Sequence, residues 1–344
     1  MGGVENAEAA HGEETSNPSV GGVRSTPSKV RRVVNILVAA LVVVVLPIVL
    51  VGMLVGEFGS AATLIGLLLG LTGSKIGGTV RMLYVAPGIG VAAGLGAFTA
   101  FDWWWVVLLA ATGVIAGAGE RFGWFPVLLM VPYAATFVSP TPSGADALIY
   151  GVVATIATAY GIVLARRFSA PEAVDGDRLA WPASIVVAVV FGLVLGVSAA
   201  IGVALGWTEP YWVSEPVLIL TLYVVIGRRE RIPEKAIGTA LGVAAAIPVA
   251  ILALPGWAIA LLASVAAVLA LVQAERYWLM YGLYTFALVL SLAGPGQVAT
   301  EAAHRGFEIL TGIALLVVGL AVIHAGVRWL TGRDPQPELA SNTK

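Results

Sequence analysis

The sequence contains no cysteine, few charged residues (11%) and only three histidines. Without cysteine the chain cannot form disulfides, thiolate metal sites or a cysteine nucleophile. The histidines, His11, His304 and His324, show no metal-ligand spacing, and no nucleophile, base and metal ligand form a recognisable set. The net charge of −1 says little about partners. We therefore expect no metal, no cofactor, no enzymatic activity and no bound nucleic acid.

Long apolar runs dominate what is present. Hydrophobic residues make up 59% of the chain and the mean hydropathy is +0.94, which is more apolar surface than a soluble domain of this length can bury. A bilayer core about 30 Å thick is crossed by about 20 apolar residues in a helix. The runs are continuous rather than alternating, which favours helices over a barrel. They extend over Val33–Gly56, Phe58–Ser74, Met82–Phe101, Trp103–Gly119, Phe122–Val138, Ala147–Ala165, Pro182–Leu205, Val213–Ile226, Ala236–Ala274, Tyr277–Ala293 and Ile309–Val327.

One of these runs, Ala236–Ala274, is long enough for two spans. We expect a hairpin turn at Leu254-Pro255-Gly256, because Pro and Gly both interrupt helices. The sequence therefore predicts an all-α integral membrane protein with about twelve transmembrane helices. The polar segment 1–31 is predicted to be a disordered tail.

Lys and Arg residues occupy every second gap between the apolar runs. Eighteen of the nineteen fall on one side when the chain is threaded back and forth across a membrane, and only Arg305 falls on the other. Short cytoplasmic loops retain basic residues, so this pattern places both termini in the cytoplasm. We expect a multi-pass protein of the plasma (inner) membrane, in contact with the lipid bilayer. The sequence does not indicate its oligomeric state.

Two short patterns recur at matching places in the two halves of the chain. Lys75-Ile76-Gly77-Gly78-Thr79 follows the second span and Lys235-Ala236-Ile237-Gly238-Thr239 follows the eighth. Glu120-Arg121-Phe122 follows the fourth span and Glu275-Arg276-Tyr277 the tenth. An even number of spans in each unit gives two repeats of the same orientation. The predicted organisation is a cytoplasmic tail (1–31), a first six-helix repeat (32–166), a cytoplasmic linker (167–181), a second six-helix repeat (182–330) and a cytoplasmic tail (331–344).

Ionisable residues near the ends of the runs are the candidate site residues. A charge in lipid is costly and usually faces a partner or a water-filled cavity. The alternative is that these charges are solvated at the headgroup level, that the basic ones only set the topology, and that Trp212 belongs to an interfacial aromatic belt. The candidates are Glu57 and Glu215 near the outer ends of the second and eighth spans, Lys75, Arg81, Arg231 and Lys235 at an inner mouth, Trp212 at an outer boundary, and Arg305 and Glu308 on one helical face at the outer start of the last span.

Glycines spaced four residues apart recur inside the apolar runs. Such pairs favour close helix crossings over nucleotide-binding loops. They include Gly66/Gly70, Gly90/Gly94, Gly113/Gly117 and Gly192/Gly196.

Three patterns follow one another in the second half: Tyr211-Trp212, Lys235-x-x-Gly238-Thr239 and Arg305-x-x-Glu308-x-x-x-Gly312. Their order and spacing resemble the fusaric acid resistance-like family of membrane proteins, which includes bacterial aromatic acid exporters. The family pattern has Arg where this chain has Lys235 and Asp where it has Glu308, so the charge is kept at both positions. The resemblance covers about residues 182–330 well and the first half only loosely.

The resemblance implies an exporter of aromatic or other small organic acids, with a small organic anion as its substrate. Its path is expected between the two six-helix halves, where basic residues at the inner mouth would attract the carboxylate. Two alternatives stay open: a passive organic-anion channel, and a non-transporting membrane scaffold. The sequence does not indicate which acid is carried or which gradient drives it.

Overall fold

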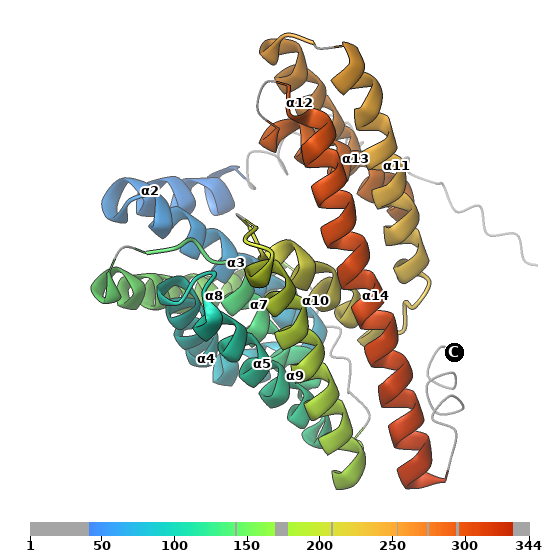
Figure 1. The fold of residues 1–344 in the computed structure, drawn as a ribbon. Helices are drawn as coiled ribbons and strands as arrows, with labels where there is room; N and C mark the ends of the chain where they lie inside the picture. The colour runs from blue at the N-terminus through green and yellow to red at the C-terminus, as the bar shows by residue number, and fades with distance from the viewer. Residues whose placement is uncertain are drawn as a thin grey trace, which may run out of the picture. The chain divides into compact units, whose positions relative to one another are not determined.

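The computed structural model describes residues 41–141, 143–168, 178–207, 209–252, 254–273, 275–293 and 296–332. The chain forms two units, Met1–Val45 and Leu46–Lys344. The described part of the first unit is one π-helical turn, Leu41–Val45. The second unit holds all the remaining described helices (Figure 1). These are α2 (Leu46–Val55), α3 (Glu57–Gly77), α4 (Thr79–Phe98), α5 (Trp103–Ala118), the 3-10 turn η2 (Gly119–Phe122), α6 (Phe125–Leu128), α7 (Met130–Thr136), α8 (Gly144–Phe168), α9 (Trp181–Ala204), α10 (Tyr211–Val225), α11 (Arg231–Leu252), α12 (Gly256–Val272), α13 (Tyr277–Leu292) and α14 (Val298–Thr331).

The described residues contain helices and no strand, which confirms the predicted all-α fold. Seven helical segments are long and apolar enough to cross a membrane, and five further apolar segments are shorter. Each predicted span overlaps one of these segments over the residues that the structure describes; the start of the first span, residues 33–40, lies outside them. The protein is therefore an all-α, multi-pass membrane protein, whereas the count of twelve crossings and the side of the termini stay predictions.

The helix boundaries follow local chemistry. Asp102, in a predicted outer gap, caps α5 by accepting hydrogen bonds from the backbone N–H groups of Trp104 (2.7 Å) and Trp105 (3.1 Å). Pro255 precedes α12 and divides the run Ala236–Ala274 into α11 and α12, as predicted. The run Phe122–Val138 is instead divided into short helices.

Two helices begin earlier than the apolar pattern predicted. α14 starts at Val298, so Arg305 and Glu308 lie inside it rather than at its start. Its 34 residues extend for about 50 Å at 1.5 Å per residue, well beyond the thickness of a bilayer core. α11 starts at Arg231, which places Lys235 one turn inside that helix.

The helices pack in a similar order in the two halves. In the first half, α3 and α4 both pack against α8, α4 packs against α7, and α2 packs against α3. In the second half, α10 and α11 both pack against α14, α11 packs against α13, and α9 packs against α10. The two halves meet mainly where α5 packs against α9. The long α14, red in Figure 1, also runs beside α9 and α11.

The glycine pairs lie where helices cross closely, as predicted. A Cβ on Gly66 would come within 2.4 Å of the Ala154 carbonyl oxygen of α8, and one on Gly90 within 2.6 Å of the Gly151 oxygen. A Cβ on Gly113 of α5 would lie 2.9 Å from the Cα of Gly192 in α9. No side chain fits at these distances, so the glycines permit backbone contact between the helices.

Candidate functional site

Six of the nine predicted site residues gather around α10 and the helices that pack against it. These six are Trp212, Glu215, Arg231, Lys235, Arg305 and Glu308. The other three, Glu57, Lys75 and Arg81, lie on α3 and α4 of the first half. The structure therefore divides the predicted set between the two halves of the chain.

Lys235 forms the first cluster, at the meeting of α10, α11 and α13. Its side chain is fully buried, and its Nζ lies 2.6 Å from Oε2 of Glu215 and 2.5 Å from the hydroxyl oxygen of Tyr281. The Tyr281 hydroxyl donates to the other carboxylate oxygen of Glu215 at 2.8 Å. The three side chains close a ring of hydrogen bonds in which the buried cation has a buried anion as its partner.

Close packing of α11 on α13 brings these groups within reach. Gly238 is one turn after Lys235, and a Cβ there would come within 2.4 Å of the Trp278 carbonyl oxygen. Gly242 would likewise meet the Gly282 oxygen at 2.5 Å. The glycine of the Lys-x-x-Gly-Thr pattern thus lets α13 approach α11 closely enough for Tyr281 to reach the lysine.

An ion pair in this position carries a large energetic constraint. A buried charge that loses its partner costs several kcal/mol, and no water in a bilayer core can take the place of that partner. Lys235 and Glu215 therefore stabilise each other only as long as both stay ionised and paired, or as long as another charged group replaces one of them. An incoming carboxylate is such a group for Lys235.

Arg305 of α14 forms the second cluster. Its guanidinium donates from Nε to Glu301 (2.7 Å), from Nη1 to Glu308 (2.8 Å) and from Nη2 to Glu209 (2.8 Å). Both Arg305 and Glu308 are buried. One cation thus faces three carboxylates, and each nitrogen of its guanidinium donates one hydrogen bond.

Trp212 completes the second cluster. The guanidinium carbon of Arg305 lies 4.9 Å from the centroid of the Trp212 ring, and the indole N–H of Trp212 donates to Glu209 at 2.7 Å. The tryptophan is buried against the cluster. This contact is a cation–π arrangement, which the alternative role as an interfacial belt residue does not require.

The short helix α10 joins the two clusters. Trp212 and Glu215 are three residues apart, so they lie about one turn apart on the same helix and each carries one cluster. Tyr211, the first residue of α10, packs its ring against Phe101 and Phe137 of the first half. The Tyr-Trp pattern therefore links the charged clusters to the first half of the molecule.

A third basic residue, Arg231, lies one turn before Lys235 on α11. It pairs with Glu234 at 2.8 Å, and its guanidinium carbon is 4.6 Å from the centroid of the Tyr277 ring. Its side chain is partly exposed, so it belongs at the margin of the site.

The three first-half candidates lie in different surroundings. Glu57 and Lys75 are exposed in the first and last turns of α3. Arg81 donates to the Gly123 carbonyl oxygen at 3.2 Å. Lys75 stands just before Gly78, where α3 ends, whereas Lys235 and its glycine lie within α11. The shared Lys-x-x-Gly-Thr pattern therefore occurs in two different environments.

Three site residues were missed by sequence reasoning: Tyr281, Glu209 and Glu301. Two of them carried a signal in their spacing. Glu301 lies four residues before Arg305, a favourable ion-pair spacing on a helix, and Tyr281 lies four residues after Tyr277. Glu209, in the turn before α10, gave no such signal because its contact with Arg305 joins distant parts of the chain.

Residues 193–319 match the protein family described as fusaric acid resistance protein-like. No curated protein sequence and no solved structure matches the chain. The apolar helices together with this match define a membrane protein of a transport-related class. The match confirms the resemblance for a segment that is less than half of the chain and that contains both charged clusters.

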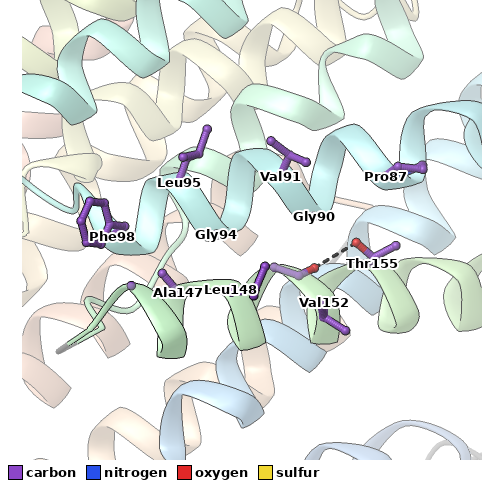
Figure 2. Close-up of a pocket in the computed structure, with 12 residues that line it drawn as sticks. Pro87, Gly90, Val91, Gly94, Leu95, Phe98, Ala147, Leu148, Val152 and Thr155 are labelled. Atoms are coloured by element: carbon purple, nitrogen blue, oxygen red, sulfur yellow. Dashed lines mark hydrogen bonds between the residues drawn. The ribbon is translucent and has the colours of Figure 1, made fainter.

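A groove of about 500 Å³ lies elsewhere, between α4 and α8 (Figure 2). Apolar side chains and glycines line it, and Val91, Leu95 and Phe98 on α4 are largely exposed. The Thr155 hydroxyl within it donates to the Gly151 carbonyl oxygen of its own helix at 2.9 Å. None of the described residues that line this groove is charged, so its surface suits lipid chains rather than an anion.

Proposed function

We propose that the protein exports small organic acids, aromatic acids among them, across the plasma membrane. One observation carries this proposal: Lys235 and Arg305 are buried among apolar helices of the family-matched segment, and each is held by at least one carboxylate and an aromatic ring. A cation that already binds carboxylates of the protein can bind the carboxylate of a substrate. The preference for aromatic acids rests on the family resemblance alone.

The chemistry of the clusters suits an aromatic carboxylate. Arg305 presents a planar fork that binds a carboxylate through two parallel hydrogen bonds once a glutamate moves away. The ring faces of Trp212 and Tyr281, at 4.9 Å and 4.2 Å from the two cations, provide stacking surfaces for an aromatic substrate. Exchange of one carboxylate for another also avoids leaving a bare charge in lipid.

The driving force of such export has two candidates. An inside-negative potential favours the outward movement of an anion by about 2.3 kcal/mol per charge per 100 mV. A passive channel for organic anions, our second candidate function, would use this potential alone. A coupled exporter would also depend on the proton gradient, through a carboxylate of the site. Collapse of the pH gradient at constant potential separates the two.

We also infer that the chain consists of two six-helix repeats of the same orientation with both termini in the cytoplasm. The matching order of helix pairs in the two halves, α3–α8 with α10–α14 and α4–α8 with α11–α14, supports the repeat. The basic residues support the orientation. The function proposed for this arrangement is transport without covalent chemistry.

Cellular accumulation of radiolabelled 4-hydroxybenzoate tests the proposed function. Cells expressing the protein should accumulate less of the acid than cells with an empty vector, and cells expressing Arg305→Gln at the same membrane level should not. Equal accumulation in all three, repeated across a panel of aromatic and aliphatic acids, would favour the scaffold interpretation. Loss of the effect on collapse of the pH gradient at constant potential would favour the exporter over the channel.

A further inference from the structure

We propose that the anion path lies within the second half, along the seam between α11 and α13, rather than between the two halves. The seam is defined here by Arg231, Lys235 and Thr239 of α11 and by Tyr277, Tyr281 and Thr285 of α13. This inference rests on the proposed function, because it describes where the substrate of that transport would move.

The seam consists of three layers with a constant register. Arg231 faces the ring of Tyr277 at 4.6 Å, and Lys235 faces the ring of Tyr281 at 4.2 Å. Both helices then advance by four residues to Thr239 and Thr285. Each step of four residues rises about 6 Å, so the layers succeed one another along two helices that run in the same direction.

The third layer contains buried polar atoms without partners. Thr239 and Thr285 are both fully buried, and neither hydroxyl has a hydrogen-bond partner. Buried threonines elsewhere in the chain, such as Thr112 and Thr158, donate to a carbonyl oxygen of their own helix. Leaving a buried hydroxyl unpaired costs about 1–3 kcal/mol. The two hydroxyls therefore offer hydrogen bonds to a polar group that enters the seam.

Arg305 lies beyond the third layer. Gly306, the next residue, packs on Val243 of α11, where its Cβ would lie 3.1 Å from a methyl carbon. Val243 is one turn after Thr239, so Arg305 follows the threonines in the order set by α11. A carboxylate moving along the seam would meet Arg231, Lys235, the two hydroxyls and Arg305 in turn.

The three cations of this series, Arg231, Lys235 and Arg305, have the same two kinds of neighbour. Each has a carboxylate partner in the protein and each lies within 4.9 Å of an aromatic ring centroid. Close glycine contacts occur both in the seam and where α5 meets α9, at Gly113 and Gly117. The boundary between the halves differs in charge, because neither α5 nor α9 carries a Lys, Arg, Asp or Glu residue. Anion-binding groups thus follow the seam and not this boundary.

Cysteine accessibility in this naturally cysteine-free chain tests the path. Thr239→Cys and Thr285→Cys are made separately, reconstituted in liposomes, and treated with the anionic reagent 2-sulfonatoethyl methanethiosulfonate. We expect both cysteines to react and 4-hydroxybenzoate flux to fall after reaction. Labelling should slow about tenfold when the acid is present at about ten times its Kd, because an occupied site does not react. If one variant fails to insert, the other, on the facing helix, carries the test.

Thr112→Cys on α5 is the matched control, because Thr112 is also buried and lies beside Gly113 at the boundary between the halves. It should neither react quickly nor be protected by the acid. Protection at Thr112 with no reaction at Thr239 and Thr285 would overturn the seam and place the path between the halves. Unreactive seam cysteines in a protein that transports 4-hydroxybenzoate would also overturn it. Absence of flux in the unmodified protein would instead refute the proposed function.

Discussion

The two halves of the molecule use similar helix packing but bury different kinds of side chain. Among the described residues, the buried polar side chains of the first half are all threonine or serine. The four buried charged side chains, Glu215, Lys235, Arg305 and Glu308, all lie in the second half. The four buried threonines of the first half donate to carbonyl oxygens of their own helices, whereas each buried charge of the second half is paired with an opposite charge. The first half is therefore built for packing, and the second half also holds groups that can bind an ion.

Replacing Lys235, a buried charge of the second half, by Met should have the largest effect on stability and on substrate binding. The change leaves Glu215 buried without its cation, which should destabilise the protein by about 3–5 kcal/mol. If Lys235 also contributes about 3 kcal/mol to binding of the substrate carboxylate, affinity should fall about 100-fold. Thermal unfolding in detergent and 4-hydroxybenzoate flux per inserted molecule measure the two effects.

The double variant Lys235→Met/Glu215→Met separates these effects. Removal of both charges should restore most of the stability, because a buried ion pair can be replaced by apolar groups at little cost. Flux should stay lost because no cation remains at this layer of the seam, between Arg231 and Arg305. Recovery of flux in the double variant would show that the pair only holds the helices together.

Arg305→Gln should abolish transport with a smaller effect on insertion. The substitution removes a cation that neutralises Glu209, Glu301 and Glu308, all within 2.8 Å of it. Adding Glu308→Gln relieves part of the remaining negative charge but should not restore flux, because no group of this cluster then receives the substrate carboxylate. Flux assays in liposomes with quantified insertion provide the measurement. Normal transport by both variants would reduce the cluster to a structural ion-pair network.

Lys75→Gln should have a much smaller effect than any change at Lys235. Lys75 is exposed at the end of α3, and exposed charges contribute about 1 kcal/mol or less. If it attracts anions to the inner mouth, the KM for 4-hydroxybenzoate should rise by less than about fivefold, and the difference should vanish at high salt. An equally large loss in Lys75→Gln and Lys235→Gln would mean that the repeated pattern acts as a pair despite its different surroundings.

The sequence predicted the fold well because lipid restricts the choice of structure. Continuous apolar runs must be helical, and Pro255 divides α11 from α12 for a reason that is local to the chain. The start of α14 was wrong because charges were taken to mark the end of a span. Arg305 and Glu308 instead neutralise each other within the helix, so the helix extends past them.

The site was predicted only in part, for a related reason. The residue types of the three patterns identified Trp212, Lys235, Arg305 and Glu308, but not their partners. Glu215 was placed near the outer end of one span and Lys235 near the inner start of the next, yet the structure joins them at 2.6 Å. Periodicity specifies which residues share a helix face. It does not specify that a helix as short as α10 brings its first turns beside the first turns of α11.

Labelling of equivalent loops should leave transport unchanged and test whether the halves share one orientation. Ala145 and Thr300 are exposed in the first turns of α8 and α14, the last helices of the two halves. Thr300 is preferable to its neighbour Glu301, because Glu301 pairs with Arg305.

An impermeant maleimide added outside intact cells should react with Ala145→Cys and with Thr300→Cys. It should react with Asp177→Cys, in the predicted cytoplasmic linker, only after permeabilisation. Both outer positions should label at similar rates if the halves are repeats related by an axis along the membrane normal. Labelling of Ala145→Cys and Thr300→Cys from opposite sides would show inverted halves, and the shared order of helix pairs would then reflect packing rather than a common orientation.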